Sequence, residues 1–253
     1  MSLSTNESKF VRSLRLKKFR QKYNNFTVEG DKMVRELAAQ QRYTVQTIYA
    51  LPEWPATAPE CAALPTVIVT ERELAQLSQL TTPNAVLAVV SSPPPQPIPN
   101  DLDRRFSLYL DGLQVPANLG AILRVADWFG FSDIILGPGT VDPYAAKSVQ
   151  AGMGSFLRLN LYSAELAELA EQFPAYPIYG ADMAGRSIFS IPLAERPPAV
   201  CLVIGSEGPG IRPATRELIT DWVSVPRAPG RVTESLNAAV AAGILISVLA
   251  NGG

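Results

Sequence analysis

The chain has 253 residues, with 22 basic and 23 acidic side chains, two cysteines and no histidine. This length allows one or two domains, and a content of 47% hydrophobic and 18% charged residues is typical of a folded globular protein. Without histidine there is no Ser-His-Asp triad, no Cys-His pair, no histidine-ligated zinc and no imidazole base. Two cysteines, Cys61 and Cys201, are too few for a four-cysteine site, so we expect no metal and a reducing compartment.

The net charge of −1 conceals an uneven distribution along the chain. Residues 1–42 hold ten basic and four acidic side chains, whereas residues 43–253 hold twelve and nineteen. Such asymmetry points to a polyanionic partner. The alternative is an amphipathic surface helix whose apolar residues face a core while its cations are solvated. The cations that would contact a polyanion are Lys9, Arg12, Arg15, Lys17, Lys18, Arg20 and Lys22.

The first ninety residues predict a small α/β domain, because their hydrophobic pattern changes repeatedly between the helical and the strand period. The predicted helices are residues 7–22, 31–40 and 71–80. The predicted strands are residues 26–28, 45–50, 67–69 and 86–90. The proline-rich stretch 51–65 predicts an irregular surface loop.

A boundary follows at residues 91–99, where five of nine residues are proline. Such a stretch forms an extended spacer, because proline continues neither a helix nor a central strand. We therefore expect an N-terminal domain at 1–90, a linker at 91–105 and a second domain at 106–253. The chain has no hydrophobic signal core and no apolar run of the roughly 18 to 20 residues that span a membrane. We expect a cytoplasmic protein without membrane contact.

The second domain alternates apolar runs with helical patterns, which favours a parallel sheet covered on both faces. The predicted strands are residues 106–110, 134–136, 156–161, 178–179, 200–204 and 222–225. A helix at 119–129 has one apolar face and ends at Gly130. A last helix at 235–249 is apolar nearly all round, so we expect it in the core or against a second subunit.

The first candidate site segment joins the strand at 106–110 to the helix at 119–129. Asn118 stands where the residue that caps the helix N-terminus is expected. Arg124 lies about 160° round the helix from the centre of its apolar stripe. Either it is a solvated residue paired with Asp127, or its guanidinium lies beyond the carboxyl end of a strand and binds a phosphate.

The second and third segments also follow buried strands. Residues 205–210 place three glycines around Glu207, so a ligand can approach the backbone closely. A carboxylate between glycines is either a turn residue or part of a site, and we favour the site. Near the start of the last helix, Ser235 and Asn237 are either helix caps or ligands of an anion.

Together these segments resemble a known family of enzymes. The motifs Asn-Leu-Gly-x-x-x-Arg at 118–124, Gly-Ser-Glu-Gly-x-Gly at 205–210 and Glu-Ser-Leu-Asn-x-x-Val-Ala-x-Gly at 234–243 occur in this order. They resemble the three motifs of the SpoU/TrmH-type RNA ribose 2′-O-methyltransferases of the SPOUT class, and residues 142–154 are similar to that family as well. The N-terminal domain is similar to the ribosomal-protein-like substrate-binding domain of many members.

The resemblance implies the fold, the cofactor and the partners. It implies a parallel-sheet domain whose C-terminus is threaded through a deep trefoil knot, although true knots are very rare. It implies that S-adenosylmethionine is bound by the backbone at Gly205, Val225 and Leu236. It further implies an RNA substrate and a homodimer formed through the C-terminal domain. Two domains and a basic arm favour ribosomal RNA over transfer RNA, by analogy with the family.

The resemblance also places Arg124 at the step in which the ribose hydroxyl loses its proton. A guanidinium keeps its proton in proteins and is a poor base, so we expect Arg124 to bind the adjacent phosphate and to stabilise the emerging alkoxide. The residues that would orient Arg124 and the ribose are Asn118, Glu207, Ser235 and Asn237. The identity of the base stays open.

The sequence departs from the family pattern at residues 226–231, where Pro-Arg-Ala-Pro-Gly-Arg replaces a shorter turn, and at Ala238-Ala239. We expect the longer loop to affect which RNA the protein accepts as substrate. A non-catalytic RNA-binding or ribosome-assembly factor on the same fold is the alternative function. A small-molecule oxidoreductase is a more distant third, because no G-x-G-x-x-G follows a strand.

Overall fold

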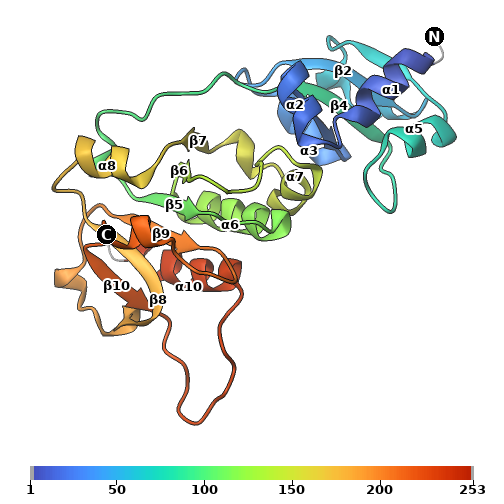
Figure 1. Ribbon diagram of the computed structural model, residues 1–253. Coiled ribbons are helices and arrows are strands. Elements are labelled where there is room, and N and C mark those ends of the chain that lie inside the picture. The colour runs from blue at the N-terminus through green and yellow to red at the C-terminus, as the bar shows by residue number, and fades with distance from the viewer. Residues whose placement is uncertain (1–2, 252–253) are drawn as a thin grey trace. The chain divides into compact units, whose positions relative to one another are not determined.

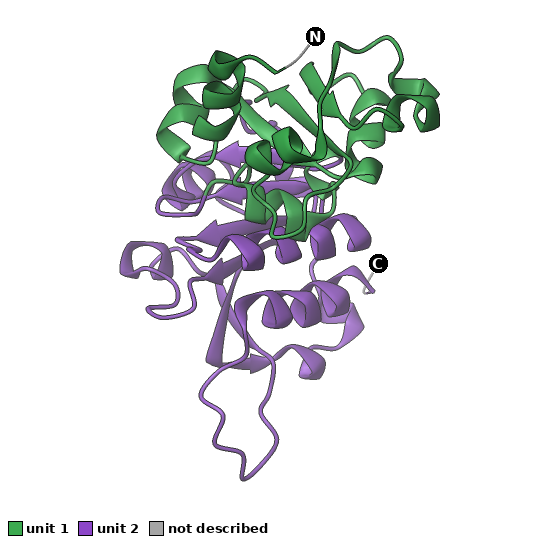
Figure 2. Ribbon diagram, turned by 90° about the vertical axis from the view of Figure 1, so that its right-hand side faces the viewer, with its two compact units in different colours: residues 1–94, 142–157 green, residues 95–141, 158–253 purple. Residues whose placement is uncertain are grey.

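The computed structural model describes residues 3–251 and forms two compact units, each with its own sheet (Figure 2). Units 1 and 2 consist of residues 1–94 with 142–157, and of residues 95–141 with 158–253. The outermost residues of the expected domains, at 1–2 and 252–253, lie outside the described part. The chain thus has the expected α/β fold, with a parallel-sheet domain and a small N-terminal domain.

Unit 1 contains a mixed four-stranded sheet in the order β1-β4-β2-β3, in which β1 and β2 run antiparallel to β4. Its strands are β1 (Asn25–Glu29), β2 (Val45–Ala50), β3 (Thr66–Ile68) and β4 (Val86–Ser91). Its helices are α1 (Thr5–Ser13), α2 (Lys17–Tyr23), α3 (Asp31–Ala38), α4 (Trp54–Thr57), α5 (Glu71–Leu77) and α7 (Ala146–Gly152). The four predicted strands are confirmed, and the predicted loop at 51–65 contains the short helix α4.

The basic run forms two helices rather than the single predicted one. Ser4 caps α1 in a reciprocal pair with Glu7, and the helix ends after Ser13. Val11 and Leu14 are fully buried, which confirms that this run has an apolar face, although Leu16 is exposed. The break between α1 and α2 was not visible in the hydrophobic pattern.

Residues 142–157 belong to unit 1, although they lie between segments of unit 2 in the sequence. Tyr144 and Phe156 form an aromatic cluster with Phe26 of β1, with ring centroids 4.5 and 5.7 Å from that of Phe26. The buried guanidinium of Arg20 forms an ion pair with Asp142 at 2.7 Å. This segment is therefore packed into the N-terminal unit by a core contact and a charge pair.

Unit 2 contains a six-stranded sheet in the order β10-β8-β9-β5-β6-β7, and every neighbouring pair is parallel (Figure 1). Its strands are β5 (Ser107–Asp111), β6 (Asp133–Leu136), β7 (Asn160–Ser163), β8 (Ile178–Ser187), β9 (Cys201–Gly205) and β10 (Asp221–Ser224). Its helices are α6 (Pro116–Phe129), α8 (Leu166–Gln172), α9 (Pro213–Arg216) and α10 (Ala238–Ala250). The predicted parallel sheet is confirmed.

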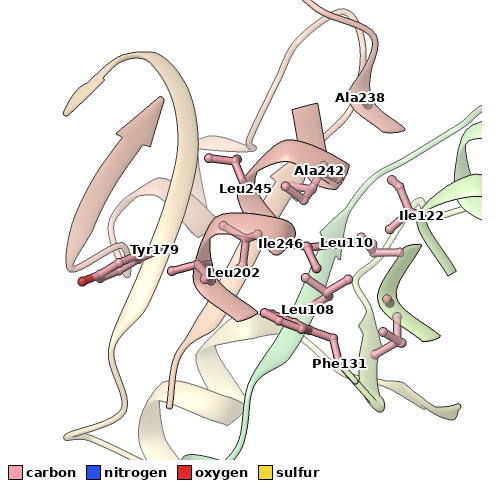
Figure 3. Close-up of a cluster of buried hydrophobic side chains, with 14 of the residues drawn as sticks. Leu108, Leu110, Ile122, Phe131, Tyr179, Leu202, Ala238, Ala242, Leu245 and Ile246 are labelled. Carbon is pink, nitrogen blue, oxygen red and sulfur yellow. The ribbon is translucent and has the colours of Figure 1, made fainter. Parts of the chain in front are cut away.

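Alternation along the strands gives this sheet two buried faces. Leu108 and Leu110 of β5 face a cluster that includes residues of α6 and α10, as Figure 3 shows. Tyr109, between them in sequence, belongs to a second cluster that includes residues of α8. The largely apolar helix α10 is therefore part of the core, and none of the helices within residues 3–251 is long and apolar enough to cross a membrane.

Two predicted strands were wrong in extent. The strand expected at 156–161 begins only at Asn160, because Ser155–Leu157 form a helical turn. The strand expected at 178–179 continues to Ser187 as β8. Its second half is polar and lacks the strand pattern, and it contains Gly185, where a Cβ would lie 2.6 Å from the backbone of Trp222. Close approach of β8 and β10, rather than hydrophobic patterning, accounts for this extension.

Candidate active site

The candidate site lies at the carboxyl ends of the central parallel strands, the edge at which open α/β sheets bind ligands. Asp111, the last residue of β5, pairs in register with Gly205, the last residue of β9. Helix α6 follows β5, and the loop of residues 205–211, here called the glycine loop, follows β9. The loop between β10 and α10 begins at the same edge and extends away from the sheet (Figure 1).

Asn118 does not cap α6, contrary to our expectation. The cap position is Val115, Pro116 is the first helical residue, and Asn118 lies in the first turn. Proline suits this position because its missing N–H has no partner there in any helix. The amide side chain of Asn118 is thus left to other partners: its Nδ2 donates to Glu207 Oε1, and its Oδ1 accepts from Asn237 Nδ2 at 3.0 Å.

Asn237 is the N-terminal cap of α10. Its Oδ1 accepts hydrogen bonds from the backbone N–H groups of Ala239 and Val240, at 3.0 and 3.3 Å. Because that oxygen is engaged, the amide nitrogen points to Asn118, and one side chain both caps the helix and joins the site. The predicted helix start at Ser235 was too early, and Ser235 is exposed without a hydrogen bond to another described residue.

The glycine loop presents Glu207 to Asn118. Ser206 and Gly210 exchange two backbone hydrogen bonds of 3.1 and 3.2 Å, which close the loop. A Cβ at Gly205 would lie 2.5 Å from the backbone nitrogen of Ile211, so only glycine allows this closure. Glu207, Asn118 and Asn237, here called the Asn118 cluster, come from three separate segments that the fold brings together.

Arg124 lies on the exposed side of α6, two turns after its start. Its side chain forms no ion pair or hydrogen bond with another residue of the described range 3–251. The alternative partner, Asp127, is instead bound to Arg158, whose Nη2 lies 2.7 Å from Asp127 Oδ2. The guanidinium of Arg124 is therefore available to a ligand from solution.

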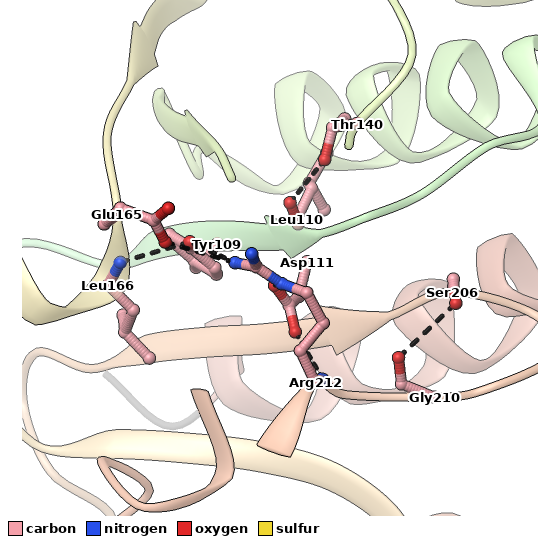
Figure 4. A network of polar contacts seen from close by, with 9 residues as sticks. All are labelled: Tyr109, Leu110, Asp111, Thr140, Glu165, Leu166, Ser206, Gly210 and Arg212. Atoms are coloured by element: carbon pink, nitrogen blue, oxygen red, sulfur yellow. Dashed lines mark hydrogen bonds and ion pairs between the residues drawn. The ribbon is translucent and has the colours of Figure 1, made fainter. Parts of the chain in front are cut away.

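A polar network beneath the glycine loop was not foreseen (Figure 4). The carboxylate of Asp111 is fully buried and forms an ion pair with Arg212. The positive charge of the guanidinium offsets the free-energy cost of burying the negative one. Burial, together with the nearby charge of Asp111, raises the pKa of Tyr109 to about 12. One signal was present in the sequence: an aspartate ends the largely apolar strand β5, and an arginine follows the glycines.

The three positions expected to line the cofactor lie around the same edge. Gly205 ends β9, Val225 directly follows β10 and packs against the core, and Leu236 precedes α10 with 47% of its surface exposed. A Cβ at Gly208 would meet nothing within 4 Å, so the backbone there is open to a ligand. Bare backbone and an uncovered apolar side chain fit a ligand with polar edges and an apolar ring system.

The seven N-terminal cations do not share one environment. The ammonium groups of Lys18 and Lys22 lie over the rings of Phe19 and Tyr23, at 5.0 and 5.4 Å from the ring centroids. Arg20 is buried, since it binds Asp142 and two backbone oxygens. Those with exposed side chains are Lys9, Arg12, Arg15, Lys17, Lys18 and Lys22.

Comparison with known proteins defines the class. A model of the SpoU rRNA methylase family matches residues 105–247, and a model of the MRM3-like substrate binding domain matches residues 6–88. Because the first match covers more than half of the chain, this protein belongs to the SpoU rRNA methylase family. The expected family resemblance is thereby confirmed. Within residues 3–251 no three His, Cys, Asp or Glu residues are grouped to hold a metal ion.

Several relatives match nearly the whole chain. The 23S rRNA (guanosine(2553)-2′-O)-methyltransferase RlmP of Bacillus subtilis is 29% identical over 238 residues, which are 93% of this chain and 92% of the relative. A structure from Porphyromonas gingivalis, assigned to the TrmH family of RNA methyltransferases, is 35% identical with a TM-score of 0.81 and covers 98% of both chains. An rRNA methyltransferase from Sinorhizobium meliloti, solved with bound S-adenosylmethionine, shares the fold with a TM-score of 0.85, at 24% identity and with 99% and 97% of the two chains covered.

Proposed function

We propose that this protein transfers a methyl group from S-adenosylmethionine to the ribose 2′-hydroxyl of a nucleotide in ribosomal RNA. The observation that carries the proposal is the Asn118 cluster, in which one residue from each family motif meets at the ligand-binding edge. Arg124, on the same helix as Asn118, forms no ion pair or side-chain hydrogen bond with another residue of the described range. Membership of the SpoU rRNA methylase family and similarity to RlmP over 93% of the chain support this reaction.

The cofactor would be held by the backbone at Gly205, Val225 and Leu236. The bare backbone of the glycine loop and the uncovered side chain of Leu236 support this assignment. When bound, S-adenosylmethionine supplies a methyl group that its sulfonium activates for transfer to an oxygen. The protein's part is to position the acceptor hydroxyl and to exclude water.

Arg124 would bind the phosphate next to the target ribose and stabilise the alkoxide that forms as the hydroxyl loses its proton. Its exposure and its lack of a described partner support this role, since an arginine already in an ion pair would have to break it first. Glu207 and Asn237 would orient the ribose through the hydrogen bonds that fix Asn118. Ser235, exposed and two residues before Asn237, would contact the ribose with them.

The N-terminal domain, residues 1–90, would bind the RNA, and residues 91–105 would link it to the methyltransferase domain, residues 106–253. The match to a substrate-binding domain supports this division, as do the exposed cations of α1 and α2. Arg20 would serve this surface indirectly, because its guanidinium is buried.

The finer features of the family complete the proposal. A deep trefoil knot would hold the cofactor between the glycine loop and the loop before α10. A homodimer would form through the C-terminal domain, and the exposed apolar side chains Val240 of α10 and Trp128 of α6, the latter 84% exposed, support such an interface. A cytoplasmic location agrees with two free, buried cysteines, Cys61 and Cys201.

The test is incubation with methyl-labelled S-adenosylmethionine and separated ribosomal and transfer RNAs, followed by mapping of nucleotides that resist alkaline cleavage. We expect label in ribosomal RNA, at a ribose. Arg124→Lys tests the site, with Arg186→Lys as a control at an exposed arginine of the same unit. Cofactor binding without label in any RNA would favour the non-catalytic alternative.

A further inference from the structure

We propose that the ion pair between Asp111 and Arg212 is a positioning device that holds the glycine loop in the shape that binds the cofactor. The inference rests on the proposed function and adds residues outside the Asn118 cluster. Asp111 is fully buried and Arg212 is one-third exposed, and neither hydrogen-bonds to a residue of the Asn118 cluster. Their effect would be exerted through the loop between them.

The geometry of the pair joins both ends of the glycine loop. Asp111 lies beside Gly205, the first residue of the loop, in the register of β5 and β9. Arg212 directly follows Ile211, the last residue. Asp111 Oδ2 accepts the backbone N–H of Arg212 at 2.7 Å, and Oδ1 accepts Nε at 2.6 Å. One carboxylate on β5 therefore anchors the loop through both main chain and side chain.

The guanidinium also contacts the connection between β7 and α8. Arg212 Nη2 donates to the hydroxyl of Tyr109 at 3.3 Å and to Glu165 Oε2 at 3.4 Å (Figure 4). The same hydroxyl accepts the backbone N–H of Leu166 at 3.1 Å. Arg212 is thus held by side chains of two separate segments, β5 and the connection between β7 and α8, which leave its side chain little freedom to move and so help to fix the end of the loop.

The glycine loop needs such an external anchor because its own sequence makes it flexible. Three of its seven residues are glycine, which lose the most conformational freedom when ordered. Within the loop, order comes from two backbone hydrogen bonds between Ser206 and Gly210 and from the Ser206 hydroxyl, which donates to the Gly210 carbonyl at 3.4 Å. A loop ordered before the cofactor arrives pays less entropy on binding and so binds more tightly. Loss of the anchor is therefore expected to weaken cofactor binding.

Asp111→Asn and Arg212→Gln remove the charge pair while keeping the size of each side chain. For each variant we expect an increase of about tenfold or more in the Kd for S-adenosylmethionine, measured by calorimetry, which is the effect of losing one charge-assisted hydrogen bond. Arg212→Lys keeps the positive charge but not the planar guanidinium with its several donors. Its Kd for S-adenosylmethionine should lie between those of the unaltered protein and of Arg212→Gln. The Kd for RNA without cofactor should stay unchanged.

Asp133→Asn is the matched control. Asp133 is also a buried carboxylate of the same sheet, bound by Asn160, Tyr162 and Arg105, but it starts β6 and so lies at the opposite edge. The substitution Asp133→Asn should lower the free energy of unfolding without changing the Kd for S-adenosylmethionine. An equal loss of affinity in Asp133→Asn, or unchanged affinity in both Asp111→Asn and Arg212→Gln, would overturn the inference.

Hydrogen exchange of the free protein gives a readout that needs no cofactor. The amides of Ser206 and Gly210 should exchange at least tenfold faster in Asp111→Asn and in Arg212→Gln than in the unaltered protein. Unchanged exchange in both would refute the positioning role. If the unaltered protein shows protected amides that both variants lose, yet binds no S-adenosylmethionine, the proposed function fails while the anchoring of the loop stands.

Discussion

The ion pair between Arg20 and Asp142 should stabilise unit 1 far more than an exposed pair of the same length. Arg20 and Asp142 are 7% and 12% exposed, and the carboxylate accepts from both Nε and Nη2, at 2.8 and 2.7 Å. Asp142→Ala leaves a buried guanidinium without its counter-charge, which typically costs about 3 to 5 kcal/mol. Arg20 keeps its hydrogen bonds to the carbonyls of Leu14 and Arg15, so we expect about 3 kcal/mol, the lower end of that range.

The assay needs a signal from unit 1 alone, because the chain has two units. Of the three tryptophans, Trp54 lies in unit 1, while Trp128 and Trp222 lie in unit 2. Urea unfolding followed by fluorescence in a background with Trp128→Phe and Trp222→Phe therefore reports on unit 1.

The control is Glu60→Ala, which breaks an ion pair of the same 2.7 Å length between Arg35 and Glu60, with 26% and 41% exposure. Its loss should lower the free energy of unfolding much less than Asp142→Ala does, because solvent screens an exposed pair. If Asp142→Ala costs no more than Glu60→Ala, burial does not decide the strength of the Arg20 pair, and the reasoning is wrong.

Three further predictions concern the site, the RNA surface and the response to pH. Arg124→Lys should lower the methylation rate about 100-fold, measured in single-turnover assays, because lysine cannot make the paired hydrogen bonds; near-normal turnover would exclude the role given to Arg124. Tyr109 stays neutral in the folded protein, because burial raises its pKa to about 12, so its contribution to stability is complete below pH 10 and is lost as the pH rises towards 12. Unfolding free energies measured between pH 9 and 12 should therefore fall less steeply in Tyr109→Phe than in the unaltered protein. Changing three exposed cations to Gln should reduce the dependence of RNA affinity on salt, by about one unit of slope or slightly less per cation in binding titrations, whereas an unchanged slope would remove α1 and α2 from the RNA surface. These cations are Lys9, Arg12 and Lys17.

Local patterning predicted the elements well where one face of an element is buried. The helix before Gly130 and the apolar strands of both sheets were foreseen, because periodicity reports directly on burial. The second half of β8 was missed, since its residues are polar and it is held by close backbone approach at Gly185. The break between α1 and α2 was missed for a related reason: it depends on packing that the run itself does not encode.

The sequence alone, through its three motifs, indicated the family and the residues that meet in the Asn118 cluster. It also indicated that a protein with no histidine and a net charge of −1 has a basic N-terminal arm. Only the tertiary structure decided how these groups are used. Asn118 binds Glu207 and Asn237 instead of capping α6; Arg20 is buried against Asp142; and Asp111 anchors Arg212. Each outcome depends on a partner from a distant segment, and neither composition nor periodicity reports on such partners.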